Sequence, residues 1–582
     1  MKPAFSIALV FWLALLTAFL PGISPAQEPD LIVHHGKVVT VDPKFTVLQA
    51  MAVKDGLILR TGTNDEILSL KGPRTELIDL EGKMVLPGLM DSHTHPASAC
   101  MTEFAHEIPN MESVTDVLRY IHDRAAIVPE DKWIVVQQVF ITRLREQRYP
   151  TRSELDIAAP KHHVVFRTGP DASFNSLALK HCGIDRNYKI PEGTAGRIEK
   201  DFHGEPTGIL RNFANYVKIP ENAAATQPTP AQKAARLKQL FKDYNSVGIT
   251  SIGDRDANPE SIALYQSLLA ENALTVRIAV SHHIDTGGPI EEIQGRIRRV
   301  AEHPLARGKD PLLRLIGIKT FLDGGMLTGS AYMRQPWGVS DIYAITDPAY
   351  RGVLFIPKER LLPIVETTVK SGLQFTAHSV GDGAVHTLLD VYADLSRTLP
   401  VRDTRPCLTH ANFMSQEAVQ QIAKLGVVVD MQPAWLYLDA RTLTKHFGNE
   451  RLRWFQPLHS LFEAGAIAGG GSDHMQKIGA LRAINFYHPF QAMWVAITRK
   501  AKNFDGTLHL EEALTREQAI RFYTANNAFL LFREKDTGSL EPGKLADFII
   551  LDTDLLTCPV DAIRETKVLR TFLTGKQIHS RE

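Results

Sequence analysis

Apolar residues near both ends of the chain gather in short runs separated by turn residues, which is the pattern of β-strands joined by tight turns. Two of these runs flank Asp55-Gly56, a dipeptide favoured at the turn of a hairpin. Strand structure is predicted at residues 30–41 (strand, turn, strand), 52–60 (a hairpin), 75–80, 83–86, 548–551 and 568–579. Each end alone has too few strands for independent stability. We therefore expect residues 27–85 and 536–582 to pair into one small β-sandwich.

Between these ends, short apolar runs alternate with helical stretches, which indicates βα units. Eight strands are predicted, at residues 85–89, 248–253, 276–282, 315–321, 373–377, 406–409, 426–431 and 466–470. Eight such units predict an α/β fold, a (β/α)8 TIM-like barrel, over residues 86–535. The interval after the first strand is too long for one helix. Residues from about 100 to 230 are therefore predicted to form an insertion, helical at 114–126 and strand-like at 133–139 and 163–167.

The first 26 residues follow a different pattern. Lys2 precedes an apolar run over residues 5–20, and Ser24-Pro25-Ala26 supplies small residues at a cleavage position. Residues 1–26 are therefore predicted to be a secretory signal peptide, with an uncleaved membrane anchor as the alternative. The run is short for a membrane span. We expect an exported protein, periplasmic or secreted, without a stable membrane span after removal of the leader.

Composition narrows the choice of partners. The 582 residues include 65 basic and 65 acidic side chains, and a net charge of zero argues against nucleic-acid binding or a polybasic membrane surface. We therefore expect a small-molecule substrate, and the sequence leaves a homo-oligomer open. The four cysteines are scattered, without the C-x-x-C spacing of a cysteine-ligated zinc site. An exported location permits disulfides, but the sequence does not pair them.

The central motif of the chain is the run from Leu86 to Pro96, which contains His93 and His95. In an extended chain, side chains two residues apart point to the same face, so these two histidines can bind one metal ion. A lone His-x-His pair is more often an ordinary surface or core feature. Further polar residues at the predicted strand ends strengthen the metal interpretation.

These further residues follow four other predicted barrel strands. They are Lys319 in strand four, His378 after strand five, His410 after strand six and Asp473 after strand eight. A barrel builds its active site at the carboxyl ends of its strands, so all six side chains are expected to meet there. Nitrogen and oxygen ligands of this kind suit zinc or a similar divalent ion.

This layout resembles the amidohydrolase superfamily of metal-dependent hydrolases, and more narrowly its family 3 branch, which contains N-substituted formamide deformylases. The similarity rests on residues 87–95, Gly204-Glu205-Pro206-Thr207-Gly208, residues 248–251, Lys319 with Asp323-Gly324, and His378 with Gly381-Asp382. It covers nearly the whole chain after the leader. The stretch before Asn175 lacks the histidine that relatives often place there, so no substrate contact is carried over at that point.

The resemblance implies a ligand set of His93, His95, Lys319, His378, His410 and Asp473. His93, His95 and Asp473 would hold one ion, and His378 with His410 a second. Lys319 would bridge the two ions as a carboxylated lysine, because an ammonium group has no lone pair for a cation. Without that modification a mononuclear site is the better interpretation. The cofactor is thus expected to be one or two divalent ions, with zinc as the first choice.

The resemblance also implies hydrolysis of an amide-type C–N bond by metal-activated water. Asp473 would accept the proton of the attacking water and pass it to the leaving amine. His474 is a weaker candidate for support of the oxyanion. Met326, Tyr332, Trp435 and Trp454 are candidates for an apolar pocket at the barrel mouth. Two alternatives remain open: a hydrolase of the same fold acting on an ester or carbamate, and a barrel that only binds its ligand.

Overall fold

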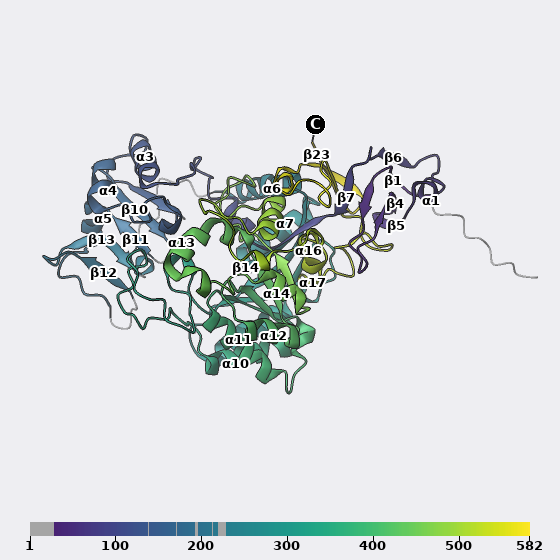
Figure 1. Ribbon diagram of the computed structural model, residues 1–582. Coiled ribbons are helices and arrows are strands. Elements are labelled where there is room, and N and C mark those ends of the chain that lie inside the picture. Colours follow the sequence, from purple (N-terminus) through teal and green to yellow (C-terminus); the bar gives the residue numbers. More distant parts are fainter. Residues whose placement is uncertain are drawn as a thin grey trace, which may run out of the picture.

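The structure is a computed structural model that describes residues 28–137, 139–169, 171–191, 196–211, 213–218 and 228–581. The predicted signal peptide lies outside these residues. Figure 1 shows three parts, with a central barrel between an inserted domain (blue) on one side and a β-sandwich (purple and yellow) on the other. The predicted fold class, a TIM-like barrel with an additional β domain, is confirmed.

The barrel is a parallel sheet of eight strands in which each strand pairs with the next one along the chain. They are β8 (Leu89–Thr94), β14 (Ile249–Ala257), β15 (Arg277–His283), β16 (Leu313–Phe321), β17 (Gln374–Ser379), β18 (Cys407–His410), β19 (Val428–Met431) and β20 (Ile467–Gly470). The segment after β20 returns to β8, where the backbone N–H of Asp473 donates to the carbonyl of His93 at 2.8 Å. This contact brings the eighth strand end beside the first.

The first barrel strand begins later than the sequence pattern indicates. The predicted strand at residues 85–89 is two strands, because β7 (Met84–Pro87) pairs with β21 of the β-sandwich and β8 starts only at Leu89. Gly88 separates them, and a Cβ placed there would lie 2.2 Å from Oγ1 of Thr250. His93 therefore lies inside the first barrel strand. The other seven predicted strands overlap the observed ones.

Helices surround the barrel and bury apolar faces on it. In α8, for example, Ile293, Ile297 and Val300 are buried at helical spacing. The helices that follow the second and later strands are α7 (Pro259–Ala270), α8 (Ile290–Glu302), α9 (Pro304–Arg307), α10 (Lys358–Lys370), α11 (Asp382–Leu395), α12 (Gln416–Leu425), α13 (Pro433–Arg451), α14 (Leu458–Glu463), α15 (Pro489–Thr498), α16 (Arg516–Phe522) and α17 (Ala525–Leu530). Two more, α2 (Pro96–Ala99) and α6 (Pro230–Ser246), lie between β8 and β14.

The two chain ends form the β-sandwich. One sheet has the order β5-β4-β1-β6 and the other β23-β22-β21-β7-β2-β3, so only the second combines both ends. The strands are β1 (Leu31–His34), β2 (Lys37–Val39), β3 (Val47–Leu48), β4 (Ala50–Lys54), β5 (Leu57–Gly62), β6 (Glu76–Asp79), β21 (Phe548–Leu551), β22 (Val568–Leu573) and β23 (Lys576–Ser580), with one helix, α1 (Asn64–Leu68). Their shared core contains Val33, Val53, Phe548 and Phe572.

The insertion leaves the barrel after β8 and carries its own sheet, in the order β12-β13-β11-β10-β9. Its strands are β9 (Trp133–Gln137), β10 (His163–Thr168), β11 (Asp171–Phe174), β12 (Arg197–Lys200) and β13 (Pro206–Arg211), and its helices are α3 (Val114–Ala125), α4 (Arg152–Ala158) and α5 (Ser176–His181). Two apolar clusters form within the insertion. Because it follows the carboxyl end of β8, the insertion stands on the barrel face where active sites form.

Two further observations concern the whole chain. In the ranges that the structure describes, every helix is too short or too polar to cross a lipid bilayer. The cysteines, whose pairing the sequence left open, are free thiols at positions 100, 182, 407 and 558.

Candidate metal centre

The six predicted ligands lie at the carboxyl ends of five barrel strands. His93 and Lys319 lie within β8 and β16, His378 is in β17, His410 ends β18, and His95 and Asp473 follow β8 and β20. His93, Lys319, His410 and Asp473 are at most 3% exposed. The side chains of His95 and His378 are 20% and 15% exposed. The cluster is therefore buried on one side and reachable from the barrel mouth on the other.

Three of the six form a compact group of possible metal ligands. Nε2 of His93 lies 3.2 Å from Nε2 of His95. Oδ1 of Asp473 lies 3.4 Å from Nε2 of His93 and 3.2 Å from Nε2 of His95. The ligand atoms of these residues all lie within 4.8 Å of one another. Their convergence matches the predicted first metal position.

The other two histidines extend the group along the strand ends. The ring of His410 stacks on that of His93 with 4.9 Å between centroids, and the ring of His378 lies edge-on to His410 at 4.6 Å. Nδ1 of His410 contacts Oε1 of Gln432 at 2.7 Å. Since Nδ1 must then carry the proton, Nε2 of His410 keeps a free lone pair.

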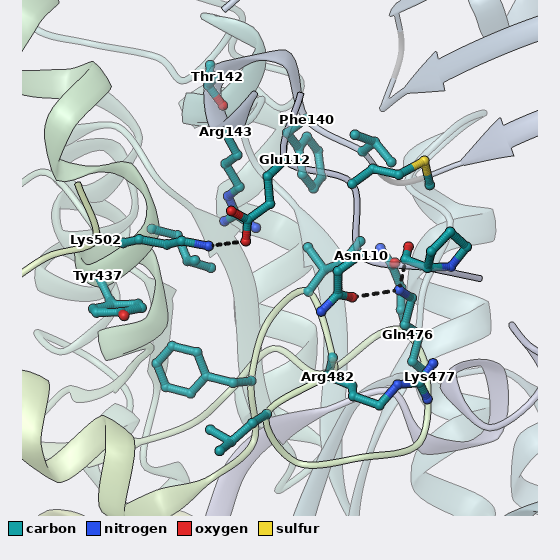
Figure 2. Close-up of a pocket in the computed structure, with 18 of the residues that line it drawn as sticks. Asn110, Glu112, Phe140, Thr142, Arg143, Tyr437, Gln476, Lys477, Arg482 and Lys502 are labelled. Carbon is teal, nitrogen blue, oxygen red and sulfur yellow. Dashed lines mark hydrogen bonds and ion pairs between the residues drawn. The ribbon is translucent and has the colours of Figure 1, made fainter. Parts of the chain in front are cut away.

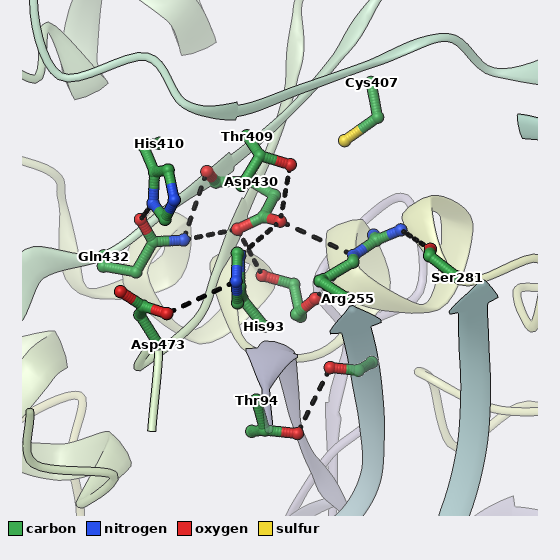
Figure 3. A network of polar contacts seen from close by, with 12 residues as sticks. His93, Thr94, Arg255, Ser281, Cys407, Thr409, His410, Asp430, Gln432 and Asp473 are labelled. Carbon is green, nitrogen blue, oxygen red and sulfur yellow. Dashed lines mark hydrogen bonds and ion pairs between the residues drawn. The ribbon is translucent and has the colours of Figure 1, made fainter. Parts of the chain in front are cut away.

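The carboxylate of Asp430, in β19, contacts the imidazole ring of His93, as Figure 3 shows. Its Oδ2 lies 3.1 Å from Nδ1 of His93 and 3.5 Å from Nε of Arg255. Gln432 and Thr409 also donate hydrogen bonds to this carboxylate. A carboxylate on the far nitrogen fixes the ring and its tautomer, so that Nε2 of His93 presents its lone pair to the cluster.

Burial keeps three of the four histidines neutral. It lowers the pKa of His93 and His410 well below the ordinary value and that of His378 to about 3, and the charge of Lys319 adds to each shift. Burial opposes protonation of His95 too, but its hydrogen bond to Asp473 and the charges of Asp473 and Asp254 outweigh it and raise the pKa. The group thus offers lone pairs and favours positive charge at its centre.

Lys319 is buried beside these ligands. Its Nζ lies 4.9 Å from the ring centroid of Phe321. Burial lowers the pKa of its amine, although Asp256, Asp430 and Asp473 oppose that shift. Imidazoles and a carboxylate in one cluster are a donor set that binds a zinc-like divalent cation, and Lys319 is buried next to them. The residues therefore fit the predicted metal, and their individual ligand roles stay predictions.

Sequence reasoning missed the residues that support the ligands. Asp430 lies in an apolar run, at residues 427–431, and only the charge inside that run could have drawn attention to it. Asp254 is another, with Oδ1 3.9 Å from Nδ1 of His95 and Oδ2 accepting from the hydroxyl of Tyr265 at 2.6 Å. It directly follows predicted strand two, and no motif of the sequence marks it as functional.

The proposal that His474 supports the oxyanion does not fit the structure. Its Nδ1 lies 2.7 Å from the hydroxyl of Tyr244, and its Nε2 faces the carbonyls of Gln476 and Lys477. The ring is fully buried and holds the loop after Asp473.

Of the four apolar pocket candidates, Trp435 lies beside a predicted ligand, with its ring 5.7 Å from His410. Met326 is fully buried in the main core, and Trp454 and Tyr332 pack against that core. All four thus lie in or against the main core, and the apolar pocket stays a prediction.

Comparison with known proteins shows similarity to hydrolases over most of the chain. The chain is 29% identical to N-substituted formamide deformylase from Arthrobacter pascens, over 94% of this chain and 98% of that protein. A metal-dependent hydrolase from Pyrococcus horikoshii superposes with a TM-score of 0.64 at 21% identity, covering 91% of this chain and 99% of that one. An adenosine deaminase from Xanthomonas campestris with bound zinc gives 0.51 at 14% identity, covering 95% and 93%.

Barrel, ligand cluster and relatives together define a metal-dependent hydrolase of carbon–nitrogen bonds. A model of the amidohydrolase family matches residues 76–579, nearly the whole described chain, so this protein belongs to the amidohydrolase family. The resemblance inferred from the sequence motifs is confirmed.

Proposed function

We propose that this enzyme hydrolyses an amide-type C–N bond of a small molecule, with His93, His95, Lys319, His378, His410 and Asp473 as its metal ligands and Asp473 as the catalytic proton acceptor. The observation that carries the proposal is the convergence of Nε2 of His93, Nε2 of His95 and Oδ1 of Asp473 within 3.4 Å. N-substituted formamide deformylase, similar over nearly the full length, supports an N-substituted amide as the substrate.

A bound divalent ion, with zinc as our proposal, would supply Lewis acidity and lower the pKa of water from about 15.7 to about 7. Oδ1 of Asp473 lies within 3.4 Å of Nε2 of both His93 and His95, and the side chain is buried. Burial raises its pKa, although His95 and Lys319 oppose the shift, so its carboxylate is a stronger base than an exposed one. It can therefore accept a proton from water and release it to the departing amine nitrogen.

Lys319 is proposed to carry a carboxylate on Nζ. In that reaction the neutral amine forms an N–C bond to CO2 and loses one proton, which leaves a carbamate with two oxygen donors. Burial that lowers the pKa of Lys319 favours the neutral amine that this step requires. A Lys319→Ala variant with fewer bound ions than the parent would support a bridge, while an unchanged ion content would favour a mononuclear site.

The activity is tested on matched substrates. The zinc-loaded protein should release amine from N-formylalkylamines, and Asp473→Asn should lower kcat/KM by about 10²–10⁴-fold, because the proton acceptor is lost. Asp554→Asn, at a half-buried site in the β-sandwich paired with Lys37, is the control and should keep parental activity. Cleavage of matched esters or carbamates, without cleavage of amides, would replace this proposal with the second candidate reaction.

We also propose export to the periplasm or outside the cell. The support is the sequence of residues 1–26, with Lys2, an apolar run and a small-residue cleavage position. Amino-terminal sequencing of the protein from fractionated cells tests it. A mature chain that starts near Gln27 in the exported fraction is expected, and an intact leader in the cytoplasmic fraction would contradict it.

A further inference from the structure

A large cavity lies between the insertion and the barrel helices, and it is separate from the metal ligands. Its volume is about 610 Å³, within the range of small-molecule sites. The walls come from residues 108–112, 137 and 139–145 of the insertion, from Tyr437 and Arg441 of α13, and from the loop at residues 476–486. Figure 2 shows these segments facing one another across the cavity.

The charged groups on the cavity wall are strongly unbalanced. Six lining residues are basic and one, Glu112, is acidic; the basic ones are Arg143, Arg145, Arg441, Lys477, Arg482 and Lys502. Three of the six have acidic partners: Arg143 pairs with Asp439, Arg482 with Glu103, and Lys502 with Glu112. The remaining positive charge makes the cavity attractive to an anion.

Lys477 is the most confined of these cations. It is 2% exposed, and its Nζ donates to the carbonyl of Pro109 at 3.2 Å and to Oδ1 of Asn110 at 2.9 Å. Both acceptors are neutral, and among the described residues no carboxylate lies within 4.0 Å of this ammonium. An ammonium has three N–H donors, so one is left for a ligand. Burial lowers its pKa, as expected for a charge without a close counter-ion.

Two polar atoms on the cavity wall have no hydrogen-bond partner among the described residues. Nε2 of Gln476 and Oγ1 of Thr142 are buried without a hydrogen bond, and both residues line the cavity at 4% exposure. Buried polar groups normally have a partner, and leaving one unsatisfied costs about 1–3 kcal/mol. Such atoms on a cavity wall indicate a polar ligand.

The loop that carries these donors also carries the metal-site carboxylate. Asp473, Gln476 and Lys477 lie in one turn that is held by His474 and by the hydroxyl of Thr102, which accepts from the backbone N–H of Lys477 at 2.7 Å. Asn485 links the two sites further. Its Nδ2 donates to the carbonyl of Asp473 at 3.0 Å, and its Oδ1 accepts from the cavity residue Arg143 at 3.1 Å.

We propose that this cavity is the specificity subsite of the enzyme and binds a carboxylate at the far end of the substrate, with Lys477 and Gln476 as its donors. The inference rests on the proposed amide hydrolysis, because it places the scissile bond at the metal centre. Ile108, Met111, Phe140, Tyr437 and Phe486 also line the cavity and suit a hydrocarbon spacer between the two ends.

The test compares N-formyl-6-aminohexanoate with N-formylhexylamine, which has the same reacting group but no carboxylate. Lys477→Met is expected to lower kcat/KM for the acid about ten- to hundredfold, because a charge-assisted hydrogen bond is lost. For the neutral substrate it should change kcat/KM less than twofold. Lys502→Met, at the same cavity but paired with Glu112, is the matched control and should affect the two substrates equally.

Gln476→Leu gives a second test that keeps the buried lysine in place, and a loss of about three- to tenfold for the acid alone is expected. Calorimetric binding of 6-aminohexanoate to the metal-loaded protein, weakened in Lys477→Met, tests the subsite without hydrolysis. A carboxylate bound only at the metal would be insensitive to Lys477. If the unmodified protein hydrolysed neither substrate, the proposed amide reaction would be rejected. If it hydrolysed and bound the acid, but the Lys477 and Gln476 variants did so equally well, only the subsite would be overturned.

Discussion

At the scale of single residues, two of the predicted metal ligands are oriented by residues outside the predicted ligand set. Asp430 orients His93 through the 3.1 Å contact to Nδ1, and Arg255 and Gln432 hold Asp430 in turn. Gln432 also contacts Nδ1 of His410. One buried network therefore sets the tautomers of two predicted ligands.

Replacement of Asp430 by Asn is expected to weaken metal binding about 10–100-fold, because the negative charge that fixes the His93 tautomer is lost. Metal affinity is measured by competition with a chelator. Asp554→Asn, in the β-sandwich, controls for the substitution type and should match the parent. Equal affinity in Asp430→Asn and the parent would mean that this contact does not orient His93.

His474 gives the protein a pH-dependent contribution to stability. Burial lowers its folded-state pKa to about 4, from 6.5 in an exposed histidine. Below pH 6.5 the unfolded chain binds a proton at this residue that the folded chain does not, so stability falls with pH until about pH 4. Between pH 7.5 and 5 this amounts to about 2 kcal/mol.

Urea unfolding of the metal-free protein at pH 7.5 and 5 measures this contribution. His474→Gln should lose about 2 kcal/mol less than the parent over that interval, because glutamine does not titrate. Chelator in both samples keeps metal release out of the comparison. The same pH-dependent loss in both proteins would show that His474 is not held neutral.

At the scale of elements, glycines let the last barrel strand approach the first. A Cβ on Gly471 would lie 2.9 Å from the backbone nitrogen and the Cβ of His93. Backbone atoms cannot yield without moving the strand. The glycine run after β20 therefore allows Asp473 to reach His93 and His95.

Gly471→Ala is expected to destabilise the barrel by about 1–3 kcal/mol and to lower its metal content, because the new methyl group displaces His93. Thermal unfolding and elemental analysis measure the two effects. Gly295→Ala, on α8, is the control, since its Cβ would meet only Nη1 of Arg299 at 3.6 Å. It should keep its metal, and a Gly471→Ala protein with parental metal content would refute the close-packing argument.

The sequence pattern located most elements but placed one wrongly. Seven barrel strands are short apolar runs bounded by polar residues, so their positions could be read directly. The first could not, because residues 84–90 form one apolar run that crosses Gly88, from β7 into the first two residues of β8. Of the insertion, β9, β10 and α3 were predicted, whereas β11, β12 and β13 were not.

At the scale of the molecule, the barrel joins two domains at opposite ends. The β-sandwich attaches through Asp547, whose carboxylate accepts from Arg277 of β15 at 2.6 and 2.7 Å. Both side chains are at most 3% exposed. The insertion attaches at the other end, where Arg143 pairs with Asp439 of α13 at 2.8 Å.

Asp547→Ala should lower stability by about 3–5 kcal/mol, because it leaves the Arg277 guanidinium buried without a counter-ion. The double variant Arg277→Met/Asp547→Leu should recover much of the loss, since no buried charge remains. Urea unfolding measures both. If the single and double variants were equally unstable, the cost would come from packing and not from the unpaired charge.

From the sequence, only those site residues could be predicted that lie at the ends of the barrel strands. The predicted ligands could be placed at one barrel face because parallel strands share their carboxyl edge. The contacts around the cavity could not be predicted. The ion pair between Arg143 and Asp439, for example, joins residues almost 300 positions apart. Such contacts depend on how the insertion docks, which no local pattern encodes.

The most direct test of the account is the metal content of the purified protein and of a His93→Ala/Asp473→Asn variant. A second possible ligand group, His34, His35 and Asp79, lies in the β-sandwich, so His35→Ala controls for ions bound there. We expect at least one ion per chain in the parent and in His35→Ala. The double variant should lose both this ion and the enzymatic activity. Parental metal content in the double variant, or full activity without metal, would contradict the proposed centre.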